Sequence, residues 1–215
     1  MNERTIGLSH ARVAIGCNAC FDASSITRAG ISLPQPITVG RRYRKGGIAV
    51  VSINPGASMD GGYKQARKRA LDRFAAGDDT ALLEYWNSLA SDATNFWNPN
   101  YLARIRRLGL HIDSLVVGNI ALCATESNRY PTWMLRNCWT RHTGAILREL
   151  APTTVVLMGA AGLMGQFAAE LSQTSSQIRV TRMAHYAHRE GAEHERGECL
   201  RVKRFIAHCE GTDAA

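Results

Sequence analysis

The sequence predicts an α/β protein built on a mainly parallel, four-stranded sheet that helices cover. Two observations lead to this fold class. Four short segments have the composition of strands, the first of them a β-rich apolar run, and segments rich in helix-forming residues lie between them. Strands that alternate with helices pair in parallel, because a helical crossover returns the chain to the same end of the sheet. A length of 215 residues is ordinary for one domain with one core, so we expect residues 1–215 to form a single domain.

The four predicted strands are residues 47–56, 114–123, 153–159 and 178–185. The first, "GIAVVSINPG", is apolar and stops at Pro-Gly, which is typical of a buried strand that ends in a tight loop. The second, "SLVVGNIALC", and the third, "TTVVLMG", are also rich in β-branched residues.

Helices are predicted over residues 63–77, 78–90, 132–152, 160–173 and 198–210. The first closes on Gly77, the second begins with acidic capping candidates, and the third is stopped by Pro152. Residues 21–46 contain two prolines and little periodicity, so we expect one long loop there. We expect a disordered C-terminal tail of about residues 211–215.

The composition is that of a soluble globular protein, with 45% apolar and 20% charged residues. No apolar run reaches the length of a membrane span, and "MNERTIGLSHARVAIG" lacks the order of a signal peptide. We therefore expect a cytoplasmic monomer without membrane contact. Since that compartment keeps thiols reduced, the six cysteines are not expected to form disulfides, and metal binding becomes an option.

The net charge of +8 comes from arginine more than lysine and gathers in three clusters, at residues 40–47, 64–73 and 103–109. Such a charge favours a polyanionic partner, most simply nucleic acid, because its phosphates release counterions on binding. The alternative for each cluster is a solvated helix face. Within the middle cluster, Arg67, Lys68 and Arg69 are the predicted phosphate contacts.

The carboxyl ends of parallel strands meet at one edge of a sheet, where ligands bind. This rule brings together residues 52–58, 119–123, 158–162 and 184–190. Asn119 lies in this set at the end of an apolar strand, where an unpaired amide is costly. A pyrimidine edge would offer it both a donor and an acceptor. The alternative is an amide satisfied by neighbouring backbone.

Four segments, "SINPG", "VVGNIALCATESNRYPT", "CWTRHTGAILRELAPTTVVLMGAAG" and "VTRMAHYAHRE", occur in this order within residues 15–205. In them the chain resembles the uracil-DNA glycosylase superfamily, and is most similar to its iron-sulfur branch, family 4. The resemblance implies a three-layer α/β/α sandwich. It also implies that a strand-end asparagine reads the pyrimidine, four residues before a cluster cysteine and a loop ending in Asn-Arg-x-Pro. Asn119, Cys123 and "NRYP" at 128–131 match this pattern.

Four cysteines lie in two groups along the sequence: Cys17 and Cys20 in an N-terminal hook at residues 15–22, and Cys123 and Cys138 around the central loop. Four thiolates suit a [4Fe-4S] cluster or a four-cysteine zinc site, and spacing alone leaves both open. The resemblance implies the [4Fe-4S] cluster, with the structural role of pinning the hook to the base-binding loop. Cys199 and Cys209 fall outside the pattern and are expected to pack in the last helix.

The first catalytic motif departs from family 4, which carries a carboxylate where this chain has Ile53. Asn54 instead resembles the asparagine of mismatch-specific and thymine-DNA glycosylases. An amide cannot take up a proton, so its predicted role is to hold the attacking water. Ile53, Pro55 and Gly56 would complete the base-binding loop with Tyr63 as a stacking candidate, and Asp60 is an alternative base or loop anchor.

In the second motif, His185 aligns with the histidine that stabilises the departing base, although Tyr186 replaces the family's proline. The alternative for His185 is a capping or core histidine. His188 and Arg189 fall where relatives insert into the duplex or hold phosphate, and amides near Ser58 would hold a flanking phosphate.

Together these features predict a DNA glycosylase that flips out uracil or a modified pyrimidine and hydrolyses its N-glycosidic bond, leaving an abasic site. Its context would be base-excision repair, or defence against phage that carry modified DNA. One alternative is a non-catalytic DNA-binding protein that keeps the fold and the cluster. Another is a redox or zinc protein that uses the four cysteines without base chemistry.

Overall fold

The computed structural model of the chain describes residues 2–29, 33–55, 62–91, 99–126, 128–159, 161–185 and 191–211. Several predicted site residues lie outside this part of the chain: Gly56, Ser58, Asp60, His188 and Arg189. The side chain of Tyr63, predicted to stack on the base, is also outside the described structure.

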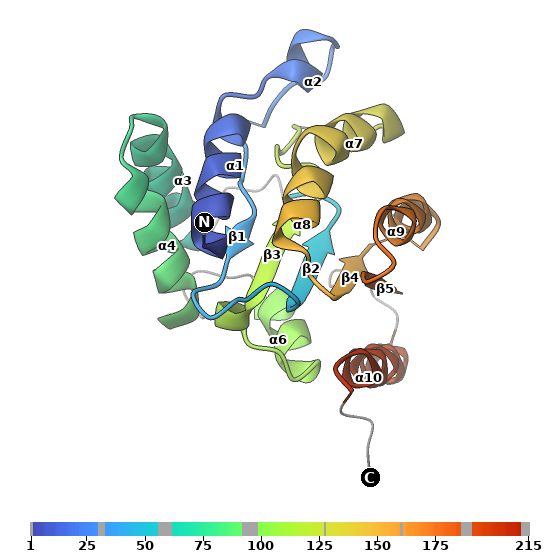
Figure 1. Ribbon diagram of the computed structural model, residues 1–215. Coiled ribbons are helices and arrows are strands. Elements are labelled where there is room, and N and C mark those ends of the chain that lie inside the picture. The colour runs from blue at the N-terminus through green and yellow to red at the C-terminus, as the bar shows by residue number, and fades with distance from the viewer. Residues whose placement is uncertain are drawn as a thin grey trace.

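The fold is α/β, with one mixed sheet of five strands in the order β1-β3-β2-β4-β5 (Figure 1). The strands are β1 (Thr38–Val39), β2 (Ile48–Ser52), β3 (Leu115–Asn119), β4 (Thr154–Met158) and β5 (Arg179–Met183). The last four pair in parallel, and each lies within a predicted strand. The predicted α/β class is therefore confirmed, with these four strands as the parallel part of a mixed sheet.

Strand β1 corrects two predictions, because it makes the sheet five-stranded and lies inside the supposed loop at residues 21–46. Thr38 and Val39 pair antiparallel with Val117 and Val116 of β3. Val39 is fully buried, so the short strand covers the edge of β3 with apolar contact as well as hydrogen bonds. Two residues are too few to show the alternation by which a strand is recognised in sequence.

The described helices are α1 (Glu3–Ile15), α2 (Ala19–Asp22), α3 (Gly62–Ala75), α4 (Asp79–Ser91), α6 (Pro99–Arg107), α7 (Thr132–Cys138), α8 (Gly144–Leu150), α9 (Ala161–Thr174) and α10 (Ala192–Cys209). The predicted helices at 63–77, 78–90 and 160–173 are confirmed by α3, α4 and α9. Helix α10 begins six residues before the predicted start at 198. Among the described helices, none has both the length and the apolar character of a membrane span.

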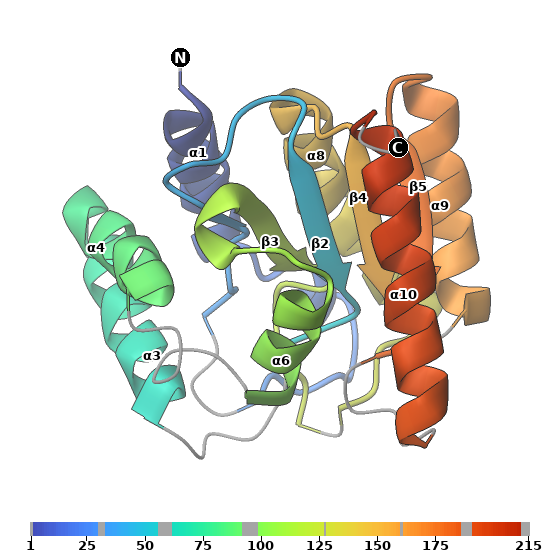
Figure 2. The same cartoon turned by 90° about the horizontal axis from the view of Figure 1, so that it is seen from below.

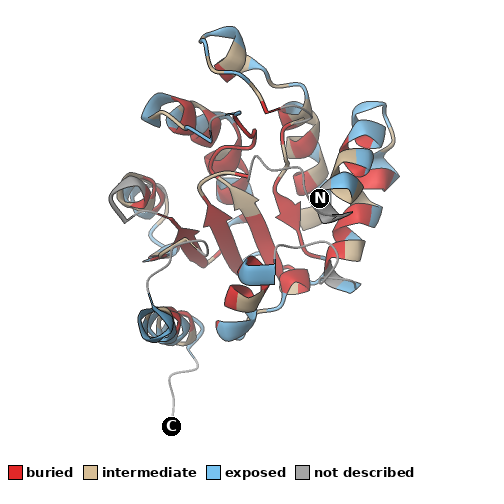
Figure 3. Cartoon of the chain, turned by 180° about the vertical axis from the view of Figure 1, so that it is seen from behind, coloured by how far each residue is buried: buried red, intermediate tan, exposed pale blue. Residues whose placement is uncertain are grey.

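Helices lie on both sides of the sheet, with α1 and α8 on one side and α6 and α10 on the other (Figure 2). Every residue of β2 and β4 is buried, as expected for central parallel strands covered on both faces. Figure 3 shows these buried strands at the centre and the exposed residues on the outer faces of the helices. The sheet is therefore a rigid support for the loops that follow its strands.

The predicted helix at 132–152 is interrupted by a π-helical turn at Trp139–Thr143, which separates α7 from α8. It ends where Ala151 adopts the left-handed conformation, with φ 45°, directly before Pro152. The π turn directs Thr143 at the end of β3. The Thr143 hydroxyl lies 2.7 Å from the carbonyl oxygen of Asn119. Turns of this kind often occur at functional sites, and this one supports the residue predicted to read the base.

Candidate active site

The carboxyl ends of β2 and β3 bring the two predicted asparagines to one edge of the sheet. Ser52 pairs with Asn119 in the ladder. The pairing continues past both strands, because the Ala121 N–H donates to the Ile53 carbonyl at 2.9 Å. The prediction that residues 52–58 and 119–123 share one rim is confirmed for the described part of these segments. Asn54 therefore follows directly after a segment bonded to the Asn119 strand.

Asn119 is half-buried, and its backbone is fixed by the ladder and by Thr143. Within the described ranges of the chain, its side-chain amide makes no hydrogen bond. The alternative, in which neighbouring backbone groups satisfy the hydrogen bonds of the Asn119 amide, is therefore not what the described residues show. The amide of Asn119 thus keeps two donors and an acceptor for a ligand.

Asn54 is held by the loop that carries the Asn-Arg-x-Pro motif. Its Nδ2 donates to Oδ1 of Asn128 at 3.0 Å and to the carbonyl oxygen of Pro55 at 3.1 Å. Asn128 has φ 51°, a left-handed conformation that asparagine tolerates better than most residues. The sequence identifies the motif as the end of a loop, but it gives no sign of the contact between the first residue of the motif and Asn54.

Tyr130 adds a second connection between the same two segments. Its hydroxyl donates to the Pro55 carbonyl at 3.3 Å and accepts from the Thr125 N–H at 3.2 Å. Burial raises the pKa of the Tyr130 hydroxyl, so the group stays protonated and can donate. Pro55 is buried beneath these contacts. The side chain of Ile53 packs against Gly159. A Cβ atom added at residue 159 would lie only 2.6 Å from Cγ1 of Ile53.

His185 follows β5 and is half-buried. The residue before it is held by a buried ion pair that the sequence does not reveal. The Ala184 N–H donates to Oε1 of Glu198 at 2.8 Å, and Nη1 of Arg104 donates to the Ala184 carbonyl at 3.2 Å. Arg104 is only 3% exposed and also pairs with Glu195 at 3.3 Å. Helices α6 and α10 thus fix the backbone that leads to His185.

All four predicted ligand cysteines line one small cavity. Three of them are buried and Cys17 is half-buried. Burial raises the pKa of the thiols of Cys123 and Cys138 to about 12 each. A thiolate in this cavity would therefore need a compensating positive charge, which a bound metal supplies.

The sulfur atoms surround the cavity and do not converge on one point. Among the described residues, no group of three or more His, Cys, Asp or Glu side chains is placed to hold a single metal ion. Two of the sulfurs accept hydrogen bonds. Asn137 Nδ2 donates to Cys20 Sγ at 3.1 Å, and the Leu122 N–H donates to Cys138 Sγ at 3.2 Å. Donors of this kind are expected around metal-ligating thiolates.

The cysteine hook is joined to the loop that holds Asn54. Arg28 donates to the Cys17 carbonyl at 3.0 Å, and its guanidinium lies 4.5 Å from the centre of the Phe21 ring. Arg28 also forms an antiparallel bridge with Thr125. The Ala29 N–H donates to the Ala124 carbonyl at 3.0 Å. The sequence predicts a connection between the hook and this loop only through a bound cofactor. In the structure the two segments also pair directly through their backbones.

The basic clusters are placed differently from one another. In the 103–109 cluster, Arg104 is buried and Arg107 pairs with Glu195, whereas Arg106 is exposed. The 40–47 cluster precedes β2 and lies at the opposite end of the sheet from Asn54. The middle cluster is on α3, where Lys68 pairs with Asp72 at 2.6 Å.

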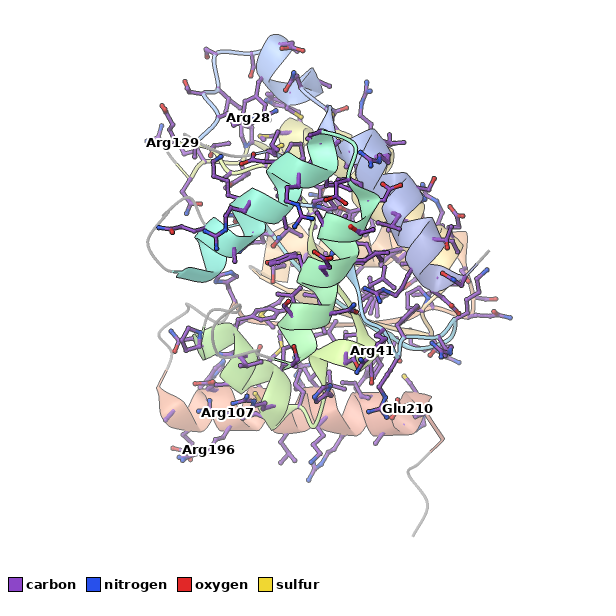
Figure 4. The ribbon with its side chains drawn as sticks, turned by 90° about the vertical axis from the view of Figure 1, so that its left-hand side faces the viewer. Arg28, Arg41, Arg107, Arg129, Arg196 and Glu210 are labelled. Carbon is purple, nitrogen blue, oxygen red and sulfur yellow. The ribbon has the colours of Figure 1, made fainter. Side chains whose placement is uncertain are left out.

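Two arginines outside these clusters lie nearer to the site. Figure 4 places Arg28 and Arg129 together at one end of the molecule, far from Arg41 and Arg196. Arg129 is exposed and follows Asn128 directly. The positive charge beside the site therefore comes partly from single arginines that no charge run would reveal.

No family model matches the chain, and no curated protein matches it.

Proposed function

We propose that the protein is a monofunctional DNA glycosylase that removes uracil or a modified pyrimidine from DNA. The observation that carries this proposal is the pair of amides at neighbouring strand ends, Asn54 and Asn119, of which the second has no partner in the described chain. Such a rim is the usual ligand site of a parallel sheet. The resemblance to uracil-DNA glycosylases supports the same assignment, and with it a three-layer α/β/α sandwich of that type.

In this proposal Asn119 reads the flipped base. Its oxygen accepts a hydrogen bond from the pyrimidine N–H, and its nitrogen donates to an exocyclic oxygen. The half-buried position matters, because a polar group left unpaired there costs more than it would in water. The site therefore favours a base whose edge presents one donor and one acceptor in the right order.

Asn54 orients the attacking water, and His185 stabilises the departing base. The water oxygen forms a bond to C1′ of the sugar while the C1′–N1 bond breaks and its electron pair goes to the base. His185 stabilises the negative charge that develops there, and the proton lost by the water finally neutralises the base. Since an amide cannot take up that proton, Asn54 contributes position and electrostatics only.

Cys17, Cys20, Cys123 and Cys138 would hold a [4Fe-4S] cluster. Four thiols around a cavity fit a group whose irons each take one cysteine. A single zinc ion would require all four sulfurs within about 2.3 Å of one point. When bound, the cluster would supply a structural connection between the hook and the Asn119 loop. Arg28 and the backbone around Thr125 make that connection from the protein side.

Arg129 and the α3 cluster would contact the DNA backbone. Phosphate contacts of this kind position the duplex and carry little sequence information. The sequence of events is then backbone binding, extrusion of one nucleotide, and pairing of its base with Asn119.

A non-catalytic DNA-binding protein is the second candidate. It is favoured by one observation, the absence of a carboxylate at residue 53 or 54, which leaves the first motif without a proton acceptor. In that case Asn54 would only connect its loop to Asn128.

The test is to incubate iron-containing protein with oligonucleotides that each carry one uracil, thymine mismatch or modified pyrimidine, single- and double-stranded. Alkali then cleaves any abasic site, and mass spectrometry identifies the free base. The proposal predicts release of at least one base, with strand cleavage only after alkali. If no base is released from the panel while the DNA is still bound, the second candidate is favoured.

A further inference from the structure

We infer that Asn128 is a positioning residue, which holds the amide of Asn54 so that its Oδ1 faces the attacking water. The inference rests on the proposed function and assigns a role to a residue that touches neither the base nor the sugar. It is carried by three features of the structure: the direction of the Asn54 amide, the turn that presents Asn128, and the contact of Tyr130.

The direction of the Asn54 amide follows from its partners. Nδ2 lies 3.1 Å from the carbonyl oxygen of Pro55, which can only accept. A flipped amide would place Oδ1 against that oxygen, so the nitrogen must face it. The second N–H of the same nitrogen points at Oδ1 of Asn128, 3.0 Å away. Both donors of Asn54 are thereby used, and its oxygen is left to accept from a ligand or water.

Asn128 is presented by a closed turn. Its N–H donates to the Thr125 carbonyl at 3.1 Å, and the Thr125 hydroxyl donates to the Arg129 carbonyl at 3.0 Å. Thr125 is fully buried. The left-handed backbone at Asn128, with φ 51°, turns the chain back toward Asn54. Asparagine combines tolerance of this conformation with a side-chain acceptor, which glycine lacks.

Tyr130 holds the turn that carries Asn128 against the segment that carries Asn54. Its hydroxyl joins the Pro55 carbonyl to the Thr125 N–H, so the turn and the Asn54 segment are connected at two points. Asn128 itself is exposed, and its bond to Asn54 competes with water in the free protein. DNA bound over this rim would exclude that water and strengthen the bond.

Asn54 acts through its position and electrostatics alone, so a loss of its orientation should be visible in the rate. A misplacement of about 1 Å at a reacting group costs on the order of a hundredfold. Without Asn128, Nδ2 loses the acceptor that fixes one of its two N–H groups, and the amide gains freedom to rotate. We therefore expect slower chemistry with little change in DNA affinity.

Two substitutions separate the side chain from the backbone. Asn128→Gly adopts φ 51° without strain but removes the acceptor. Asn128→Asp tolerates the same conformation and keeps an acceptor for Nδ2. With enzyme in excess and DNA saturated, Asn128→Gly should lower the single-turnover rate by roughly 10- to 100-fold. Asn128→Asp should keep the single-turnover rate close to that of the wild type, since a carboxylate oxygen accepts the same bond.

A double substitution tests whether Asn128 acts through Asn54. In an Asn54→Ala background, Asn128→Gly should produce no further loss of rate, because the group that it positions is gone. Independent multiplication of the two effects would overturn the inference. So would a wild-type rate for Asn128→Gly.

The contact is also tested without any activity. The side-chain NH₂ of Asn54, observed by NMR, should exchange slowly with water in the wild type and faster in Asn128→Gly. Unchanged exchange would overturn the inference even if the protein is an active glycosylase. If the wild type releases no base from any oligonucleotide, the proposed function fails and the catalytic role of Asn128 fails with it, whereas slowed exchange would still verify the contact.

Discussion

The buried guanidinium of Arg104 lies 3.6 Å from the carboxylate of Glu198, and together they hold both polar groups of the Ala184 backbone. Arg104 comes from α6 and Glu198 from α10, which follow different strands of the sheet. Their common target is the residue before His185. The position of the predicted second catalytic motif therefore depends on two helices that make no direct contribution to the proposed chemistry.

This ion pair gives the first prediction. Replacing Arg104 by methionine keeps much of the apolar stem but removes the buried guanidinium that pairs with Glu195 and Glu198, and leaves Glu198 with the Ala184 N–H and the more distant Arg201 at 3.9 Å. Breaking a buried pair in this way costs about 3–5 kcal/mol. The free energy of unfolding, measured with denaturant, should fall by about that amount. Arg106→Ala, an exposed change on the same helix, should stay within about 0.5 kcal/mol of wild type. Equal stability of the two variants would show that the pair does not hold this end of the sheet.

The cysteine cavity gives the second prediction. Protein purified with iron available should be brown and contain iron and acid-labile sulfide. Cys123→Ala and Cys138→Ala should lose the colour and most of the soluble protein, because a structural ligand is missing. Cys209→Ala, which lies outside the cavity, should keep both. Stoichiometric zinc without visible absorbance would reverse the cofactor assignment.

Salt dependence gives the third prediction. If Arg129 and the α3 cluster contact phosphates, DNA affinity should fall steeply as salt rises. Arg129→Gln should reduce the slope by about one phosphate contact, and joint replacement of Arg67, Lys68 and Arg69 should weaken binding to all sequences alike. Arg196→Gln, at the far end of the molecule in Figure 4, is the matched control and should leave the slope unchanged. If neither Arg129→Gln nor the triple substitution changes the salt dependence of DNA affinity, the DNA binds elsewhere on the protein.

Base selection gives the fourth prediction. Asn119→Asp removes the amide donors and adds an acceptor at the same position. The preferred pyrimidine should therefore change, and release of the original base should fall more than DNA affinity does. The ratio of release rates across the oligonucleotide panel measures this. An unchanged ratio would mean that Asn119 does not contact the base.

Much of the sheet is predictable because apolar runs are local. Strands β2, β3 and β4 lie within runs rich in apolar β-branched residues, and the strand-end rule alone is enough to place Asn54 and Asn119 on one rim. Strand β1 is not predictable in this way, because its pairing with Val116 and Val117 is decided by the open edge of β3. The π turn also escapes prediction, because a shifted hydrogen-bond pattern leaves the helical composition unchanged.

The site is less predictable because its contacts join residues far apart in the chain. Asn54 and Asn128 are separated by 74 residues, and their contact depends on a left-handed turn that only tertiary packing orients. For Arg104 the sequence predicts an exposed side chain, whereas the structure shows a buried one. In sequence it belongs to an arginine run, and charge runs usually lie in solvent. Its burial follows from acidic partners on α10, which no local pattern connects to it.

The most direct test of the proposed function compares base release and DNA binding in the wild type, Asn54→Ala and His185→Ala. On the preferred oligonucleotide, each variant should lower the single-turnover rate by roughly a hundredfold or more while its DNA affinity stays close to wild type, because these contacts strengthen only in the transition state. Full activity of both variants, or no base release by the wild type on any pyrimidine tested, would contradict the account.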